Sequence, residues 1–489
     1  MQRTYLHHSL RGDDVLLSHL LKNVPCSEIK KNVNVTSIVS DSRKVTDGCV
    51  FVCIKGENFD SHVLAQDVCR RGAVAVVVQN DVGIPEQIVV EDTKKALAHM
   101  CAEFYHNAHK KLKIIGVTGT NGKTSTTFMI KRILEHTGKK VGLIGTVAYS
   151  SGKDKISDAE LTTPEPYELH RMFYSMQSRG CEYCVMEVSS QALAQQRCHG
   201  IEFDCAVFTN LTTDHLDYHK TMENYCAAKG ELFANSKMSV VNADDKNAQY
   251  IFGFVKGKAL FFSQKSDNAD FFAHTVSLKK DCCEYVIGNI NVTVPIPGEF
   301  TVYNSLGAIA CCGSMGIPLE VCAEALKEMK TVPGRAEVIP TDTPYTVIID
   351  YAHTPDAIRN ILTTVRNVTD GRVVALFGCG GDRDKSKRPL MARAAAENAD
   401  YVIITTDNPR TENPNEIIED ILPGIRDTNT PCAVIPDRTY AIEFALKNAS
   451  ENDTIILCGK GHETYQIIGK SKHPYDEREI VKRYLQKLE

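Results

Sequence analysis

The chain has 489 residues, and at roughly 150 residues per domain this length predicts about three domains, each large enough for its own core. Its composition, 43% hydrophobic and 24% charged, is that of a globular protein, and no apolar run approaches the roughly 18 residues that cross a membrane. Disordered and membrane-spanning classes are excluded. The formal net charge of −5 argues against a broad nucleic-acid-binding surface, so we expect neither nucleic-acid nor membrane partners.

The first part of the chain is predicted to be a small α/β unit. Residues 33–108 alternate helix-like stretches with the β-rich runs VTSIV, VFVCI, AVAVVV and IVV. The last helix-like stretch covers 93–108, after which the basic sequence HKKLK (109–113) leads into a new strand. We therefore expect a domain boundary after residue 108.

The second unit opens with a phosphate-binding sequence. The strand IIGV is followed by TGTNGKTSTTFMIKRILEH, which is a glycine-rich turn leading into an amphipathic helix. In such a loop, backbone N–H groups and the helix N-terminus bind phosphate groups. The lysine, here Lys123, contacts the β- and γ-phosphates, and the next residue, Thr124, ligates Mg²⁺. The usual spacing would place a glycine at Val117, whereas Gly116 and Gly119 flank it, so the loop is a variant. The residues predicted to bind ATP are Gly119, Thr120, Asn121, Gly122, Lys123, Thr124 and Ser125.

Two further segments of this unit carry titratable groups at strand ends, where open α/β sheets bind ligands. Glu187 ends the strand YCVMEV, and the segment after CAVFTN contains His215 among several acidic residues. A following helix carries Lys229. Taken singly, Glu187 reads as a solvated cap and Lys229 as a surface lysine, but such density of titratable groups indicates a site. Glu187 and His215 are candidates for a second metal, with Lys229 near it.

The strands VGLIGT, YCVMEV, CAVFTN and SVVNA alternate with helices, which predicts a parallel sheet, and ALFFS and EYVIGNINVTVPI are predicted as hairpin-like runs. The sequence TVPGRAEVI (331–339) interrupts the pattern. A third series then follows: YTVIID, VVALFG, YVIITT, CAVIP and TIILCG. The fold class is therefore α/β, with domains at 1–108, 109–333 and 334–489. We expect a P-loop-ATPase-like parallel sheet in the centre and a Rossmann-like C-terminal domain.

The 18 cysteines are interpreted as reduced thiols. The N-terminal sequence MQRTYLHHSL carries charges and histidines where a signal peptide has its apolar region, so we expect a cytoplasmic protein whose cysteines pack as small core residues. A zinc site is the alternative, because Cys181 and Cys184 form a C-x-x-C with Cys198 and His199 downstream. No second C-x-x-C follows at finger spacing, which disfavours it.

Eight motifs identify the chain as resembling one family. The motifs occur in the order found in the Mur ligase family, and the match covers nearly the whole chain. In chain order they are GVTGTNGKTSTT, MEVSSQAL, FTNLTTDHLDYH, PGRAEV, DYAHTPDA, FGCGGDRDKSKRP, TTDNPR and GKGHETYQ. The resemblance implies a cytoplasmic, monomeric, ATP-dependent amide-forming ligase of peptidoglycan synthesis. It also implies Mg²⁺ as a cofactor and a CO₂-derived carbamate on Lys229.

The resemblance also assigns residues. It implies Mg²⁺ ligation by Thr124, Glu187, His215 and Lys229, with Lys123, Glu187, His215 and Lys229 as the catalytic set. SIVSDSRKVTDGCVFV resembles a uridine-nucleotide segment, pointing to Ser42 and to the GENFDSH loop from Gly56. Contacts to the UDP-MurNAc dipeptide (UDP-MurNAc-L-Ala-D-Glu) are implied for Thr162, Thr163, Ser189, Gln195 and Arg197. Additional ATP contacts are implied for Asn304, Arg335 and Asp350.

The acceptor site is expected in the third unit. DNPR, comprising Asp407, Asn408, Pro409 and Arg410, follows the strand YVIITT; as a bare tetrapeptide it is equally a turn. In the family it resembles the motif that selects meso-2,6-diaminopimelate, whose second carboxylate an arginine holds in a bidentate pair that lysine lacks. The diaminopimelate-binding residues implied by the resemblance also include Arg383, Gly459 and Glu463. Glu463 would accept a hydrogen bond from the ammonium group at the distal centre of diaminopimelate.

The reaction implied is amide formation through an acyl phosphate, giving ADP and phosphate. His353 is either a phosphate-positioning group or base, or a buried structural histidine. The alternatives are the same chemistry with L-lysine, glutamate addition to a folate as in folylpolyglutamate synthase, and a non-catalytic ATP-binding module. Cys379 and Cys458 lie beside the acceptor loops, where thiol modification would inhibit.

Overall fold

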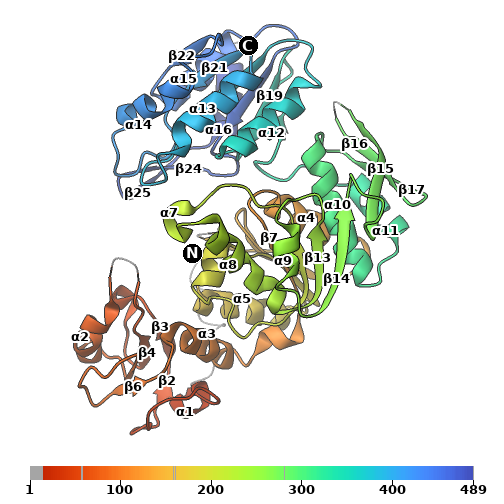
Figure 1. The fold of residues 1–489 in the computed structure, drawn as a ribbon. Coiled ribbons are helices and arrows are strands. Elements are labelled where there is room, and N and C mark those ends of the chain that lie inside the picture. The colour runs from red at the N-terminus through yellow and green to blue at the C-terminus, as the bar shows by residue number, and fades with distance from the viewer. Residues whose placement is uncertain are drawn as a thin grey trace.

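The computed structural model describes residues 15–56, 59–152, 154–157, 159, 161–279 and 281–487. Figure 1 shows three groups of helices and strands that follow one another along the chain. Each contains a sheet with helices against it, so the predicted α/β class is confirmed. Part of the predicted GENFDSH loop, residues 57–58, lies outside the described residues. The boundaries at 108/109 and 333/334 stay predictions.

The first group is built on a four-stranded parallel sheet in the order β3-β4-β5-β6. The predicted runs VTSIV, VFVCI, AVAVVV and IVV form these strands. The expected helix over 93–108 is shorter than predicted, because His106 and Asn107 adopt left-handed backbone conformations that end it. The elements are β1 (Val15–Leu16), α1 (Leu17–Leu20), β2 (Asn34–Val35), β3 (Ser37–Val39), η1 (Ser42–Lys44), β4 (Cys49–Val52), η2 (Ser61–Leu64), α2 (Ala65–Arg70), β5 (Ala75–Val78), β6 (Gln87–Val89), α3 (Thr93–Phe104) and η3 (Ala108–Lys111).

The second group carries an 11-stranded sheet in the order β10-β9-β8-β11-β7-β12-β13-β14-β15-β16-β17. Strands β8, β11, β7, β12, β13 and β14 are parallel, so their carboxyl ends meet at one edge. The strands are β7 (Lys113–Thr118), β8 (Val141–Ile144), β9 (Tyr149–Ser151), β10 (Asp154–Ser157), β11 (Tyr183–Glu187), β12 (Phe203–Phe208), β13 (Ser236–Asn242), β14 (Lys258–Ser263), β15 (Phe271–Leu278), β16 (Cys283–Ile287) and β17 (Ile290–Val294). The helices are α4 (Lys123–His136), α5 (Pro166–Ser178), α6 (Ser190–Ala194), α7 (Leu216–His219), α8 (Met222–Ala234), α9 (Ala248–Phe252), α10 (Glu299–Ser314) and α11 (Leu319–Lys327).

One of the two predicted hairpins is wrong. EYVIGNINVTVPI does form the antiparallel pair β16–β17. ALFFS instead lies in β14, which pairs in parallel with both β13 and β15. The apolar run is short, and periodicity does not distinguish a hairpin arm from a buried parallel strand.

The third group carries a six-stranded sheet in the order β18-β19-β23-β20-β21-β22, parallel except for the edge strand β18. All five predicted strands are present. A short hairpin, β24–β25, had not been predicted. The elements are β18 (Glu337–Ile339), β19 (Thr346–Asp350), α12 (Pro355–Arg366), β20 (Val373–Phe377), α13 (Lys387–Asn398), β21 (Tyr401–Ile404), α14 (Pro414–Ile421), η4 (Leu422–Gly424), β22 (Cys432–Val434), α15 (Arg438–Lys447), β23 (Thr454–Cys458), β24 (Tyr465–Ile468), β25 (Ser471–Pro474) and α16 (Glu477–Gln486).

The cysteines pack as predicted, as free thiols. Cys26 and Cys432 are exposed and Cys69 and Cys282 are partly buried, while the others are buried. Among the described residues, no helix is both long and apolar enough to cross a membrane.

Candidate active site

The phosphate loop connects β7 to α4 and is supported by the segment after the neighbouring strand β12. Thr120 N–H donates to the carbonyl of Asn210 at 2.9 Å, and Asn121 N–H donates to Asn210 Oδ1 at 2.9 Å. The Thr209 hydroxyl donates to the Asn121 carbonyl at 2.6 Å. Gly119 has φ +151°, and a Cβ there would overlap the Thr209 hydroxyl, so this position requires glycine. Strand, loop and helix stand in the predicted order.

Lys123 begins α4 and lies against its own loop. Its Nζ donates to the carbonyls of Gly119 and Thr120 at 2.8 and 2.9 Å. Burial lowers the pKa of Lys123. The nearby Glu187 carboxylate opposes this lowering of the pKa, and the Arg335 guanidinium adds to it. The amine is therefore held beside the N–H groups of the loop, which is where a lysine meets nucleotide phosphates.

Thr124, Glu187 and Arg335 come together from three distant parts of the chain. The Thr124 hydroxyl donates to Glu187 Oε2 at 3.1 Å, and the Arg335 guanidinium Nη2 lies 2.9 Å from the same hydroxyl oxygen. Glu187 also accepts from Thr146 N–H at 2.8 Å and from the Thr146 hydroxyl at 3.0 Å. A hydroxyl and a carboxylate beside a phosphate loop are hard oxygen donors, which fit Mg²⁺. Both side chains are buried, so they are held in place for such a cation.

Lys229 lies on α8, beneath the phosphate loop. Its side chain is 1% exposed, and Nζ donates to the Gly119 carbonyl at 2.9 Å and lies 4.6 Å from the centre of the Tyr225 ring. Burial and the neighbouring Lys123 lower the pKa of Lys229 well below its ordinary value. Asp214 acts on it electrostatically, but that carboxylate forms its ion pairs with His215 and Lys387. An amine so placed favours a neutral or modified form over a buried cation, which fits a carbamate.

His215 immediately precedes α7, and its ring stands 3.4 Å from Asp214 Oδ2. Burial lowers the pKa of His215, Asp214 opposes this, and both site lysines lower it further. Burial raises the pKa of Asp214, but His215, His353 and Lys387 outweigh it, so the net pKa is lowered. Among the described residues, no group of three or more His, Cys, Asp or Glu stands close enough to bind a metal. The full set of Mg²⁺ ligands therefore stays a prediction, and the zinc alternative at Cys181 has no support in this geometry.

His353 lies at the cleft wall contributed by the third sheet. Its Nδ1 is 2.8 Å from the Tyr351 carbonyl, which assigns the proton to Nδ1. Burial and Lys387 lower its pKa to about 4, while Asp214 opposes them, so the ring is neutral near pH 7. Both readings of His353, structural and phosphate-positioning, are compatible with this.

A cleft of about 730 Å³ joins these groups between the second and third sheets. The predicted ATP residues that line it are Thr120–Ser125, Asn304, Arg335 and Asp350, and Thr162 lines it as well. Gly119 is not among the lining residues, but its carbonyl accepts from Lys123 Nζ. Asp350 accepts from two backbone N–H groups, of Ala336 and Ala352, both at 2.7 Å. Several lining residues were not selected from the sequence, because nothing in their local pattern sets them apart: Asn210, Asn242, Asp244, Asp245, Lys265, Tyr303, Arg359 and Asn360.

Four of the predicted sugar-peptide residues, Thr163, Ser189, Gln195 and Arg197, form one cluster at the carboxyl end of β11. Thr163 donates its hydroxyl to the Glu187 carbonyl at 3.0 Å and accepts from Ser189 N–H at 3.0 Å. Arg197 donates to the Thr163 carbonyl at 2.8 Å and to Gln195 Oε1 at 3.0 Å.

Gln195 also lines a second cavity, of about 790 Å³, between the first and second groups. Lys55, Lys94 and Tyr218, which were not selected from the sequence, line it too. Ser42 lies in η1, and Ser40 rather than Ser42 lines this cavity.

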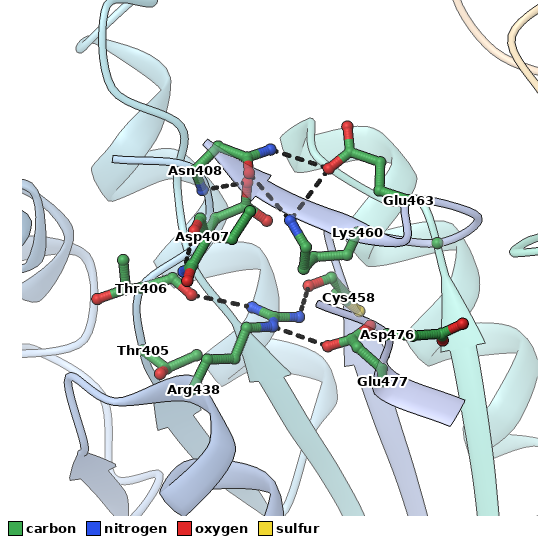
Figure 2. A network of polar contacts seen from close by, with 12 residues as sticks. Thr405, Thr406, Asp407, Asn408, Arg438, Cys458, Lys460, Glu463, Asp476 and Glu477 are labelled. Atoms are coloured by element: carbon green, nitrogen blue, oxygen red, sulfur yellow. Dashed lines mark hydrogen bonds and ion pairs between the residues drawn. The ribbon is translucent and has the colours of Figure 1, made fainter. Parts of the chain in front are cut away.

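The predicted acceptor residues follow the carboxyl ends of β20, β21 and β23 and lie outside the cleft lining. Figure 2 shows three of them, Asp407, Asn408 and Glu463. Asn408 Nδ2 donates to Glu463 Oε2 at 2.9 Å, and Asn408 N–H donates to Asp407 Oδ1 at 2.6 Å. Asp407 Oδ2 is buried without a hydrogen-bond partner. Gly459 has φ +112°, and a Cβ there would stand 2.6 Å from that oxygen. The loop is thus packed around a carboxylate oxygen that lacks a donor.

Arg410 and Arg383 provide positive charge beside that network. The Arg410 backbone is left-handed, at φ +50°, and is held by hydrogen bonds to Ile467 at 3.1 Å and to Gly469 at 2.8 Å. Its Nη1 donates to the Gly381 carbonyl at 2.8 Å. Burial and the neighbouring Arg410 lower the pKa of Arg383. In the part of the chain that the structure describes, neither guanidinium forms an ion pair with a carboxylate, so the pair is suited to an anionic ligand.

The suggestion that Cys379 and Cys458 are the sites of inhibitory thiol modification is not supported. Both are buried, and burial raises the pKa of Cys379 to about 12 and that of Cys458 well above its ordinary value. Thiolate formation is therefore disfavoured at both.

The fold, the phosphate loop and the cleft beside it are typical of the α/β P-loop class of nucleotide-binding enzymes. A family model described as the Mur ligase middle domain matches residues 117–312, and one described as Mur ligase, glutamate ligase domain, matches residues 334–461. The chain belongs to the Mur ligase family, whose members are ATP-dependent amide-forming ligases.

Its similarity to curated relatives extends over nearly the full length. It is 45% identical over 482 residues to the UDP-N-acetylmuramoyl-L-alanyl-D-glutamate--2,6-diaminopimelate ligase of Clostridium perfringens, covering 96% of this chain and 99% of the relative. It is 46% identical over 484 residues to the enzyme of that name from Caldanaerobacter subterraneus, covering 97% and 99%. A solved structure of a ligase with that name aligns with a TM-score of 0.69 at 30% identity, covering 97% of this chain and 99% of the other.

Proposed function

We propose that the chain adds meso-2,6-diaminopimelate to UDP-N-acetylmuramoyl-L-alanyl-D-glutamate, with conversion of ATP to ADP and phosphate. The observation that carries the proposal is the Arg410 guanidinium, held beside Asn408 and Gly381 and not paired with a carboxylate of the described chain. A diamino diacid supplies the missing carboxylate, which an L-lysine acceptor lacks. The names and near-full-length similarity of the relatives support the same acceptor.

The first step joins the two substrates of the cleft. The γ-carboxylate of the D-glutamyl residue attacks the γ-phosphorus of ATP, the bond to the β-phosphate oxygen breaks, and ADP leaves. Lys123, the loop N–H groups and Arg335 stabilise the negative charge that develops on the transferred group. Carboxylate is a poor acyl donor, and the acyl phosphate supplies the leaving group that amide formation needs.

In the second step, the diaminopimelate amine attacks the acyl carbon and phosphate leaves, with the ammonium proton released to solvent. Asn408, Arg410 and Glu463 orient the acceptor so that the reacting amine faces the cleft. The acceptor site lies on the third sheet, whereas the phosphate loop follows β7 of the second. We therefore expect the two groups to close on each other during turnover.

Thr124 and Glu187 would hold Mg²⁺, which neutralises phosphate charge when bound. His215 and a carbamate on Lys229 would hold a second cation. The support for the carbamate is the buried position of Lys229, the adjacent Lys123 and the hydrogen bond from Nζ to the Gly119 carbonyl. We also propose that the monomer is the active form; its mass in solution under assay conditions tests this.

The proposal is tested by supplying purified protein, Mg²⁺, ATP and the muramoyl dipeptide nucleotide with one amino acid at a time. We expect phosphate release that depends on meso-diaminopimelate and is roughly 30- to 150-fold weaker with L-lysine, because a bidentate pair with the partly exposed Arg410 contributes about 2–3 kcal/mol. Equal turnover of the two would refute the acceptor assignment. Glutamate addition to a folate would favour the folylpolyglutamate alternative, and no amino-acid-dependent phosphate release would favour a non-catalytic module. Lys123→Ala should abolish phosphate release while the circular dichroism spectrum is retained.

A further inference from the structure

Lys460 is a buried cation in the acceptor region that the reaction scheme leaves without a role. It follows β23 and lies between Gly459 and Gly461, which have φ +112° and +54°. Its side chain is fully buried, at 0% exposed. A buried ammonium is costly unless every proton finds a partner, so its partners indicate what it does.

Those partners are the side chains of two predicted acceptor residues, as Figure 2 shows. Lys460 Nζ donates to Asn408 Oδ1 at 3.0 Å and to Glu463 Oε2 at 3.1 Å. The Ile467 N–H donates to the same Asn408 Oδ1 at 2.9 Å. Two donors on this oxygen fix the amide orientation, because a flipped amide would point its NH₂ group at an ammonium and an N–H. Asn408 Nδ2 is therefore directed at Glu463 Oε2.

The Glu463 carboxylate is consequently divided into two oxygens with different roles. Oε2 accepts from both Lys460 and Asn408, whereas Oε1 accepts no hydrogen bond from the described residues. The side chain is 12% exposed, so Oε1 is accessible at the site surface. Burial raises the pKa of Glu463, and Lys460 opposes that rise. Without Lys460, the carboxylate would lose a donor and the countercharge that keeps it ionised.

We propose that Lys460 is a positioning residue for acceptor selection. It fixes the Asn408 amide and holds Glu463 Oε2, leaving Oε1 to accept from the ammonium at the distal centre of a 2,6-diamino diacid. The inference rests on the proposed function and deepens it: Arg410 reads the distal carboxylate, and Lys460 acts through Glu463 on the distal amine. The two amino acids flanking the lysine are glycines whose backbone angles place it there.

The test compares two acceptors that differ only in that amine, meso-diaminopimelate and 2-aminopimelate. For Lys460→Met we expect KM for diaminopimelate to rise ~10- to 100-fold, the range for losing a charge-assisted hydrogen bond, with KM for ATP and for the nucleotide substrate unchanged. For 2-aminopimelate, which has no distal ammonium, KM of the same variant should rise less than ~3-fold. The Lys460 substitution and the missing ammonium remove the same interaction, so their effects do not add. Lys460→Arg should restore part of the selectivity.

A matched control is Arg372→Met. Arg372 pairs with buried Asp453 at 2.7 Å in the same sheet but at the amino ends of its strands. This variant should lose stability without changing the ratio of kcat/KM for the two acceptors. If Lys460→Met does not fold, Lys460→Met combined with Glu463→Gln removes both charges together, and its acceptor ratio should equal that of Glu463→Gln alone.

The role of Lys460 would be overturned if Lys460→Met raised KM equally for both acceptors, or if it left KM for diaminopimelate unchanged. An additional selectivity loss in the double variant beyond Glu463→Gln would overturn it as well. Failure of the proposed function gives a different result, since the wild-type protein would then not turn over diaminopimelate at all.

Discussion

Replacing Arg410 by methionine tests acceptor selection most directly, because the backbone around it does not depend on the side chain. The Arg410 N–H donates to the Ile467 carbonyl, and its own carbonyl accepts from Gly469 N–H at 2.8 Å. Methionine retains the length and apolar stem but removes every donor. The loop should therefore keep its position while losing the positive charge.

The size of the expected loss in kcat/KM depends on which donors of the Arg410 guanidinium are already used within the protein. Nη1 donates to the Gly381 carbonyl at 2.8 Å, which leaves the remaining donors for a substrate carboxylate. A bidentate pair at this partly exposed position contributes about 2–3 kcal/mol, less than two fully buried charge-assisted bonds. Since 1.36 kcal/mol corresponds to about a factor of ten, kcat/KM for meso-diaminopimelate should fall roughly 30- to 150-fold.

The assay is phosphate release at limiting acceptor, with meso-diaminopimelate and L-lysine measured in parallel. The lysine value should change by less than ~3-fold, because lysine has no distal carboxylate for Arg410 to hold. Arg393→Met is the control: this arginine pairs on the surface of α13 with Glu397 at 3.3 Å, and its loss should leave both values unchanged. If the ratio of kcat/KM for diaminopimelate to kcat/KM for lysine is unchanged in Arg410→Met, the reasoning is refuted.

Three further substitutions probe other parts of the molecule. Lys229→Ala should lower phosphate release at least ~100-fold, because it removes the carbamate proposed to hold the second cation; full activity would contradict the carbamate, and wild-type activity should fall in bicarbonate-free buffer. Gly119→Ala should lower both nucleotide binding and Tm, since the new Cβ would overlap Thr209, and unchanged ADP affinity would argue against the tight loop. Glu412, whose pKa is lowered to about 2 by Arg388, stabilises the fold above about pH 4.5 and loses this effect as pH falls toward 2. Glu412→Gln should therefore have a lower Tm than wild type at pH 7, with a difference that shrinks by pH 3.

The sequence was most informative where a motif is local. The strand, loop and helix around Lys123 follow each other directly, and the structure has them in that order. Glu187 was placed correctly at a strand end because the alternation of apolar runs defines where β11 stops. DNPR follows β21 for the same reason. Periodicity and turn chemistry act over a few residues, so these assignments need no knowledge of the rest of the chain.

What could not be predicted depends on register and strand order between distant segments. The contacts of Thr209 and Asn210 with the phosphate loop exist because β12 lies next to β7 in the sheet. The hairpin β24–β25 was missed, although its Ile467 holds both the Arg410 backbone and the Asn408 side chain. The role of Lys460 was missed with it. A tertiary network of this kind leaves no periodic trace in the sequence.

The bond between Arg335 and Thr124 has a practical consequence for ligand discovery. The two residues are 211 positions apart and face each other across the nucleotide cleft. A screen against a truncated protein containing residues 109–333 would present one wall of that cleft without Arg335. Compounds selected there would be ranked without the contacts that the third unit adds in the intact protein. Screening should therefore use the full-length chain, where a ligand that bridges both walls gains affinity by linking the two units.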